Sequence, residues 1–234
     1  MDDRLKAHWI RTVWRLTDLL GRCRGRQAAS RGLAAAGSDA IAAAEILAMI
    51  RRCPQPVCRV ADIGCGSGRI ARSLMRQGGL DQVVAVDYLP RRAGPAVRGL
   101  DYVVADGRRL PFRPQSFDFI YCYSLLHYLP LADVERLLTR LKAALRPQGR
   151  LLLAEVISRR GYFNAHLRRQ PMPAFTKALW RVYLNLAYPY YFHPRADLEA
   201  VYRRLGMAFD YFAQDGRMPY ARHVHHVLLH SSNR

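Results

Sequence analysis

The stretch Arg59–Arg69 reads R-V-A-D-I-G-C-G-S-G-R and is the part of the chain best suited to hold a ligand. Val60, Ala61 and Ile63 are typical of a short buried strand, and glycines follow at alternate positions. Glycine suits such a turn because a Cβ would block the tight backbone path and the close approach of a ligand. The pattern predicts a strand, a binding turn and a helix start, with a nucleotide-like ligand.

An acidic side chain narrows the chemistry of that ligand. Asp62 comes two residues before Gly64, at the expected carboxyl end of the strand, where doubly wound sheets bind their ligands. A carboxylate there suits a cationic group better than a pyrophosphate. The spacing G-C-G-S-G also differs from the G-x-G-x-x-G of dinucleotide-binding turns. An aminoacyl nucleoside is therefore favoured over a dinucleotide.

Further motifs follow in order along the chain. They are V-V-A-V-D ending at Asp87, V-V-A-D-G ending at Gly107, F-D-F-I-Y-C-Y-S-L-L-H-Y-L, and L-R-P-Q-G-R-L-L-L-A-E. With them the chain resembles the class I S-adenosylmethionine-dependent methyltransferases, in particular the small-molecule branch that includes ubiquinone and menaquinone biosynthesis enzymes. The resemblance covers Ile41–Glu155 well and the C-terminal end loosely. It implies S-adenosylmethionine as the cofactor.

The expected cofactor-binding residues are assigned from their positions at strand ends, and the resemblance strengthens these assignments. Asp62 would orient the cationic end, and Asp87 would accept hydrogen bonds from the ribose hydroxyls. Tyr88 would lie against adenine, and Asp106 would receive the adenine amino group with the Gly107 backbone nearby. The alternative is that the acids merely cap strand ends. The full expected set is Asp62, Gly64, Cys65, Gly66, Gly68, Asp87, Tyr88, Asp106, Gly107 and Tyr123.

The exit of the fourth expected strand carries the first candidate for catalysis. Methyl transfer from a sulfonium needs alignment and exclusion of water, and a base where the acceptor must lose a proton. His127 is the first candidate base because its ordinary pKa lies near neutrality, although it could simply hold the turn; His166 and His193 are the alternatives. The expected substrate residues are Tyr123, His127, His166, Tyr190, Tyr191, Phe192 and His193.

These residues would be positioned by alternating strands and helices, which imply parallel strands with helices on both faces. Strands are expected at 59–63, 82–87, 102–105, 118–122 and 150–155, and helices at 69–77, 131–145 and, in short form, 91–98. Residues 207–213 and 222–230 read as a hairpin that would close the family's sheet. The expected fold is α/β, a Rossmann-like doubly wound seven-stranded sheet with an antiparallel last strand.

The chain has two expected additions to this fold, one before the domain and one inserted within it. Residues 1–40 are expected to be an N-terminal helical extension, and residues 41–234 the methyltransferase domain with a cap insertion at 158–195. The amphipathic pattern over 1–21 favours a lid or dimer element, with a membrane-surface helix as the alternative. After a basic connection at 21–37, Ser38 or Asp39 would cap a second helix.

Aromatic residues concentrate in Gly161–His193, which falls outside the strand-helix alternation. We expect this segment to form a cap over the cofactor's methyl group, because rings exclude water and align an apolar acceptor. The alternative is that these side chains extend the core or a dimer contact.

The formal net charge is +19, from 37 Lys and Arg against 18 Asp and Glu. A positive surface of this kind attracts polyanions such as nucleic acid or an anionic membrane. However, the arginines are scattered, and no N-P-P-Y-type or Pro-Cys sequence follows the fourth strand. A nucleic acid or membrane partner is therefore not favoured.

Five cysteines without metal-ligand spacing fit a reducing compartment, and no export signal is evident, so a cytoplasmic protein is expected. His223 and His225 alone make a poor metal site, so no metal is expected. The leading hypothesis is methyl transfer to O, N or C of an apolar or aromatic small-molecule acceptor. The alternatives are methylation of RNA or of an anionic lipid head group, and a catalytically silent cofactor-binding scaffold.

Overall fold

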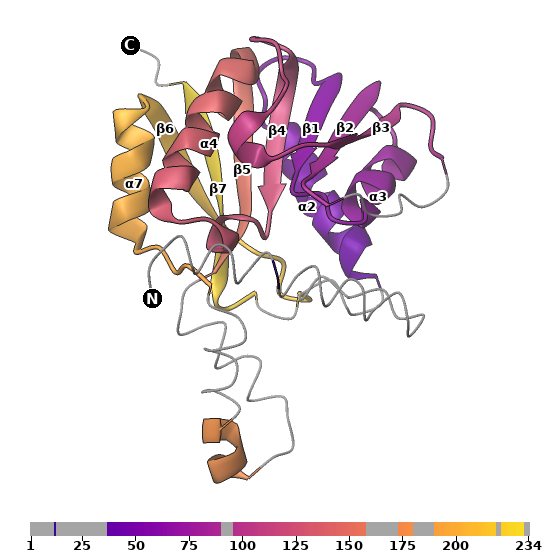
Figure 1. Cartoon of the computed structure of the whole chain (residues 1–234). Helices are drawn as coiled ribbons and strands as arrows, with labels where there is room; N and C mark the ends of the chain where they lie inside the picture. The colour runs from indigo at the N-terminus through magenta and orange to yellow at the C-terminus, as the bar shows by residue number, and fades with distance from the viewer. Residues whose placement is uncertain are drawn as a thin grey trace.

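The computed structural model describes residues 12, 37–89, 96–157, 173–179, 190–218 and 221–231. A seven-stranded sheet in the order β3-β2-β1-β4-β5-β7-β6 runs through its middle (Figure 1). The strands are β1 (Arg59–Ile63), β2 (Gln82–Asp87), β3 (Leu100–Val104), β4 (Phe117–Tyr123), β5 (Leu145–Ile157), β6 (Met207–Ala213) and β7 (Val224–Ser231). Strands β1 to β5 pair in parallel, and β7 is antiparallel to both of its neighbours. The predicted Rossmann-like sheet with an antiparallel last strand is confirmed.

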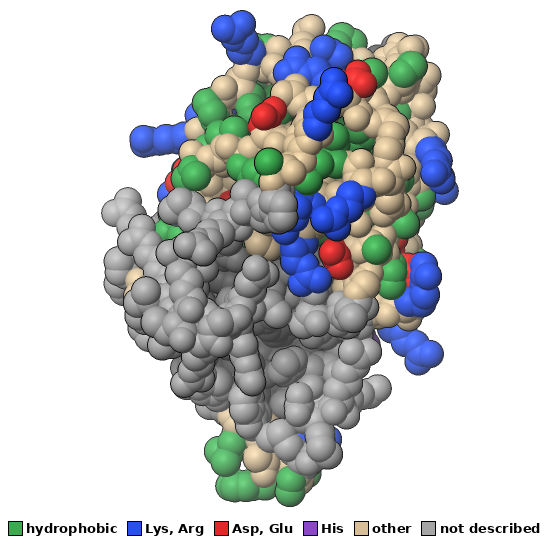
Figure 2. Space-filling view, turned by 90° about the vertical axis from the view of Figure 1, so that its right-hand side faces the viewer, with side chains coloured by type: hydrophobic (Ala, Val, Ile, Leu, Met, Phe, Trp, Pro, Cys, Tyr) green, Lys and Arg blue, Asp and Glu red, His purple; other side chains and the backbone are tan. Residues whose placement is uncertain are grey.

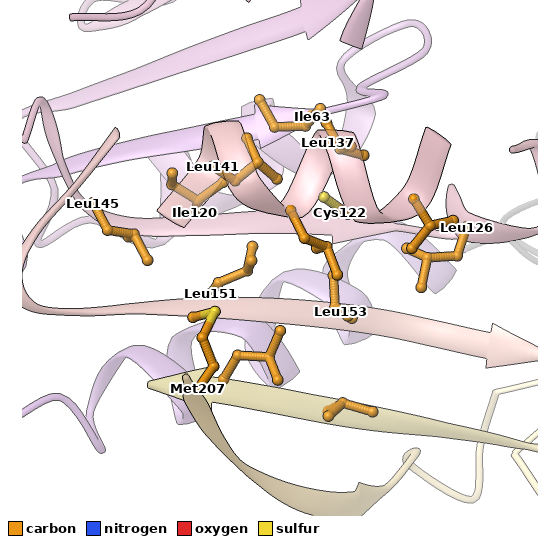
Figure 3. Close-up of a cluster of buried hydrophobic side chains, with 14 of the residues drawn as sticks. Ile63, Ile120, Cys122, Leu126, Leu137, Leu141, Leu145, Leu151, Leu153 and Met207 are labelled. Atoms are coloured by element: carbon orange, nitrogen blue, oxygen red, sulfur yellow. The ribbon is translucent and has the colours of Figure 1, made fainter. Parts of the chain in front are cut away.

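Helices cover both faces of the sheet (Figure 1). Helices α4 (Leu131–Ala144) and α7 (Arg195–Arg204) pack on one face, and α2 (Ser38–Ile50) and α3 (Arg69–Gln77) pack on the other. Figure 3 shows Leu137 and Leu141 of α4 lying against Ile120 and Cys122 of β4. Because helices bury both faces, the central strands read as nearly continuous apolar runs rather than alternating ones.

The start of α2 differs from the prediction. Gly37 occupies the N-cap position with φ 84°, so neither Ser38 nor Asp39 caps the helix. Asp39 lies instead in the first turn and forms an ion pair of 3.2 Å with Arg69 at the start of α3. Glycine adopts a left-handed backbone at no steric cost, so Gly37 can occupy the N-cap position in this conformation.

Other boundaries moved by a few residues. Strand β5 begins earlier than expected, at Leu145, and β7 covers Val224–Ser231. Residues 96–98 are not helical, and the rest of the expected short helix lies outside the described residues. Gly206 follows the end of α7 with φ 62°.

Several predictions fall on residues that the structure does not describe. They include the helix at 1–21 except Thr12, the connection at 21–36, and most of the cap at 158–195 with His166. The two domain boundaries therefore stay predictions. Within the described parts of the chain, no helix is both long and apolar enough to cross a bilayer.

Candidate functional site

The glycine turn after β1 requires its glycines. Gly64, Gly66 and Gly68 all have left-handed backbones, with φ of 79°, 57° and 69°. A Cβ on Gly64 would lie 2.9 Å from Leu125 Cδ1, and one on Gly68 would lie 2.3 Å from the Tyr102 hydroxyl. The dihedral angles therefore strain any larger residue at these positions, and a Cβ at Gly64 or Gly68 would also displace the Leu125 or Tyr102 side chain.

Asp87 at the tip of β2 holds this turn in place. Its Oδ2 accepts a hydrogen bond of 2.7 Å from the Gly66 amide, and its Oδ1 accepts one of 2.9 Å from the Leu89 amide. A carboxylate has about four acceptor positions, so capacity remains for further donors. The structure thus joins two predicted cofactor residues, and ribose binding by Asp87 stays a prediction.

Asp62 is buried at the carboxyl end of β1, with 2% of its surface exposed. Burial raises its pKa to about 7, which the neighbouring Tyr121 hydroxyl opposes in part and the Asp87 charge reinforces. Tyr121 lies opposite Asp62 in the pairing of β1 with β4, yet its buried hydroxyl makes no hydrogen bond of normal geometry. A buried carboxylate beside a hydroxyl without a hydrogen-bond partner fits the cationic amino end of an aminoacyl nucleoside.

Asp106 is already engaged by a neighbouring cation. It caps the 3₁₀ turn η1 (Gly107–Arg109) by accepting from the Arg108 amide at 2.9 Å. Its two oxygens also accept from the Arg108 guanidinium, at 3.0 and 3.1 Å from Nε. Tyr88 lies close enough to raise the pKa of Arg108 further, after the larger effect of Asp106. An adenine amino group bound at Asp106 would therefore share the carboxylate with Arg108.

The exit of β4 borders the glycine turn, because Leu125 packs directly against Gly64. His127 follows in the 3₁₀ turn η2 (Leu126–Tyr128) and is buried. Its ring centre lies 4.2 Å from that of Tyr128 and 4.9 Å from that of Tyr190. The predicted base therefore lies in an aromatic cluster beside the predicted cofactor turn.

The predicted substrate residues 190–193 reach the same place from a distant part of the sequence. The Tyr191 amide donates to the His127 carbonyl at 2.9 Å. His193 Nε2 lies 3.0 Å from the Leu129 carbonyl oxygen, and Phe192 contacts the Tyr190 ring edge to face, with centres 6.4 Å apart. The described end of the aromatic segment is thus fixed on the loop that follows β4.

A buried polar network adjoins this site and was missed by the sequence analysis. It contains Glu45 of α2, Glu155 of β5, Gln214 after β6 and His226 of β7. Tyr123, predicted to contact cofactor and substrate, has its hydroxyl in this network, where it accepts from Gln214 Nε2 at 2.9 Å. One clue was available, because Glu155 is the single acid in the apolar run L-L-L-A-E-V that ends a central strand.

Among the described side chains, no three His, Cys, Asp or Glu residues are grouped so as to hold a metal ion. The residues do fit S-adenosylmethionine, since the turn has three left-handed glycines and the buried Asp62 carboxyl lies beside the Tyr121 hydroxyl, which has no hydrogen-bond partner. That cofactor would supply an electrophilic methyl group on a sulfonium.

Comparison with known proteins agrees with this geometry. Residues 61–153 match the family described as "Methyltransferase domain". Ubiquinone biosynthesis O-methyltransferase from Xylella fastidiosa is 31% identical over 114 residues, which are 45% of this chain and 45% of that protein. Malonyl-acyl-carrier-protein O-methyltransferase from Methylococcus capsulatus is 30% identical over 134 residues, 52% of this chain and 48% of the relative. The matches thus span about half the length of these relatives.

Solved structures share the fold across more of the chain. Magnesium protoporphyrin IX methyltransferase from Synechocystis PCC 6803, with bound SAM, has a TM-score of 0.59 at 15% identity and covers 99% of this chain and 98% of that one. An S-adenosylmethionine dependent methyltransferase from Mesorhizobium loti has a TM-score of 0.57 at 22% identity, covering 81% and 99%. The segment that matches a methyltransferase domain therefore lies in a chain whose described residues share the fold of these solved methyltransferases. Residues 61–153 are the segment that matches the methyltransferase domain family.

Proposed function

We propose that the protein transfers a methyl group from S-adenosylmethionine to O, N or C of an apolar or aromatic small molecule. The observation that carries this proposal is the ring cluster of His127, Tyr128, Tyr190 and Phe192 beside the glycine turn. Organic ligands are usually held among apolar and aromatic side chains with few polar groups, and this cluster has that composition.

The chain's own residues would act mainly by alignment. Aromatic walls exclude water and hold an apolar acceptor in line with the methyl group, and ring faces attract the positive charge of a sulfonium. Asp62 and Asp87 would hold the amino end and the ribose, so that the cofactor enters in one orientation. The relatives described above include two O-methyltransferases, which supports the same class of reaction.

Cofactor binding and methyl transfer can be tested separately. We expect S-adenosylmethionine to bind the wild type, measured by calorimetry, and Asp87→Ala to reduce this affinity at least about tenfold, since an active-site charge-assisted hydrogen bond is worth roughly 1.5–3 kcal/mol. Asp101→Ala, on the exposed start of β3, is the matched control and should bind normally. Unchanged binding in Asp87→Ala would contradict the cofactor assignment.

Radiolabelled methyl transfer with a panel of extracts then tests the activity itself. Incorporation into small apolar products supports the proposal, whereas cofactor binding without transfer to any fraction supports a catalytically silent scaffold. Size-exclusion chromatography with light scattering tests a homodimer, and cell fractionation tests the cytoplasmic location, both of which are parts of the proposal.

Methylation of RNA or of an anionic lipid head group is a second candidate, favoured by the net charge of +19. The probable tRNA methyltransferase 9B of Mus musculus is also 30% identical over 105 residues, although these cover only 22% of that protein. Figure 2 shows Lys and Arg side chains spread over the visible described face rather than gathered in one patch. Polyanion binding that weakens steeply with salt would support this candidate, and no binding to RNA or vesicles at low salt would remove it.

A further inference from the structure

The end of β5 contains a bulge that redirects one acidic side chain. Leu153 pairs with Val227 and Val156 pairs with His225, so Ala154 and Glu155 share the position opposite His226. Glu155 has φ 54°. Bulges are common beside active sites, where they re-aim a side chain. A left-handed backbone at a residue other than glycine is strained, so the surrounding structure must hold it.

A second strained residue lies beside it. Ser124, directly after β4, has φ 55°, and its amide donates to the Ala154 carbonyl at 3.0 Å. Strained backbones thus occur on two neighbouring strands at the same carboxyl edge of the sheet. This edge also holds the glycine turn, because Leu125, the residue after Ser124, packs against Gly64.

The redirected Glu155 carboxyl is buried, with 4% of the residue exposed. It interacts with the side chains of Ser124 and Gln214 and with the charge of Glu45, and Tyr123 faces both acids from β4. Burial, followed by the Glu45 charge, raises the pKa of Glu155 to about 7, against the effect of the two hydrogen-bonding side chains. The carboxyl can therefore exchange a proton near neutral pH.

His226 fixes the backbone of the bulge. The Glu155 amide donates to His226 Nδ1 at 3.1 Å, so that nitrogen carries no proton. The proton of the neutral ring then lies on Nε2, which donates to Glu45 Oε1 at 3.2 Å. The Asp215 amide donates to the same oxygen. Elements α2, β5, β7 and the end of β6 are thus joined around Glu155.

The network holds more acceptors than donors. Glu45 Oε2 and Gln214 Oε1 are buried and make no hydrogen bond, although buried polar atoms are nearly always paired. Such a cluster favours the arrival of a proton or of a hydrogen-bond donor.

From this geometry we infer that Glu155 is the proton acceptor for the methyl transfer proposed above, and that the acceptor molecule carries a nucleophilic O–H or N–H group. The acceptor's lone pair forms the bond to the methyl carbon, and the carbon–sulfur bond breaks with its electron pair remaining on sulfur. The acceptor's proton moves to a Glu155 carboxylate oxygen and passes to solvent after the product leaves. Glu45, His226 and Gln214 act as positioning residues. The inference rests on the proposed function.

Glu155→Gln keeps the size of the side chain and removes its ability to take a proton. Methyl transfer from S-adenosylmethionine to a panel of phenols and arylamines is measured against pH, at saturating cofactor so that cofactor binding does not enter. We expect the wild-type kcat to rise through about pH 7. In Glu155→Gln this rise should disappear and kcat should fall at least about a hundredfold, as general base catalysis typically contributes that much.

A thermal-unfolding readout tests, independently of activity, whether Glu155 takes up a proton near pH 7 in the folded chain. The pKa of Glu155 is higher in the folded chain than in the unfolded chain, so wild-type stability falls as the pH rises from about 4.5 to about 7. Relative to the wild type, the Tm of Glu155→Gln should therefore be higher at pH 8 than at pH 5. Glu135→Gln, at an exposed position of α4, is the matched control and should show wild-type activity. A Glu155→Gln protein destabilised equally at both pH values would identify a structural residue and overturn the inference.

The remaining outcomes are also decisive. If His127→Gln removes the pH dependence while Glu155→Gln keeps it, the base is His127 and the inference is wrong. If the wild type methylates a panel member with a pH profile that Glu155→Gln shares, the inference fails and the proposed function stands. If the wild type methylates no phenol or arylamine, the proposed acceptor class is contradicted together with the inference.

Discussion

Single buried acids set the chemistry of the candidate site at the residue scale. Asp62 and Glu155 lie at the carboxyl ends of β1 and β5, and burial raises the pKa of each to about 7. The two differ in their partners, since Asp62 faces Tyr121 and the glycine turn while Glu155 faces Glu45 and Gln214. One is therefore suited to hold a cation and the other to exchange a proton.

Cofactor affinity should depend on pH through Asp62. A cationic amino group stabilises the carboxylate, so binding releases a proton wherever the unbound Asp62 is protonated, below about pH 7. The affinity for S-adenosylhomocysteine, measured by calorimetry, should thus rise by up to about tenfold from pH 6 to pH 8. Asp62→Asn should bind more weakly at pH 8 and lose this dependence. An affinity that is constant over this range would contradict the placement of Asp62 at the amino end.

At the element scale, the proposed acceptor side consists of short connections rather than helices or strands. The turn η2 after β4 and the residues before α7 are held together by the bond between the Tyr191 amide and the His127 carbonyl. Tyr190 and Tyr191 are buried by this contact. The aromatic segment is therefore anchored at its C-terminal end, next to the position expected for the methyl group.

Alanine replacements at Tyr190, Tyr191 and Phe192 should reduce methyl transfer by more than they reduce cofactor affinity. Loss of ring contacts worth roughly 0.5–1.5 kcal/mol each should lower transfer about threefold to tenfold per residue. Transfer is measured with the radiolabelled cofactor and affinity by calorimetry. Phe175→Ala, 75% exposed, is the matched control. Variants that unfold, or that lose cofactor and activity together, would show that these rings are structural.

Excess positive charge is the main electrostatic feature of the whole molecule. Several of the described acids are paired with arginine, such as Glu135 with Arg204 at 2.9 Å and Asp118 with Arg146 at 2.8 Å. Since 37 basic residues face 18 acidic ones, many arginines must repel one another. Exposed ion pairs contribute little to stability, so net repulsion should dominate the response of the fold to salt.

Melting temperature should therefore rise with ionic strength. Raising sodium chloride from about 0.02 M to about 0.2 M shortens the screening length from roughly 20 Å to below 10 Å, which weakens repulsion over the surface. The measurement is a thermal melt at constant pH. Sorbitol is added to the low-salt sample so that both samples have the same osmolarity. A lower melting temperature at the higher salt would mean that ion pairs outweigh repulsion.

The sequence by itself determined the parts of this protein that depend on local pattern. The bounds of β1, β2 and α3 agree with the predicted ranges, because a short apolar run, a glycine turn and a periodic helix succeed one another there. The same pattern placed Asp62 and Asp87 at strand ends, where the parallel order of the sheet brings them to one edge. The hairpin of β6 and β7 was also predicted from the strand patterns and the family resemblance.

Only the tertiary structure decided which residues meet at that edge. Glu155 reads as the end of an apolar strand, and its exposure, direction and pKa depend on a bulge and on Glu45, Gln214 and His226, which come from other elements. Arg108 engages Asp106 for a different, local reason, since the turn after β3 brings its guanidinium onto the carboxylate two residues earlier. Periodicity specifies which face of a strand is buried, whereas a polar network depends on packing between elements distant in sequence, and burial then sets the protonation of its acids.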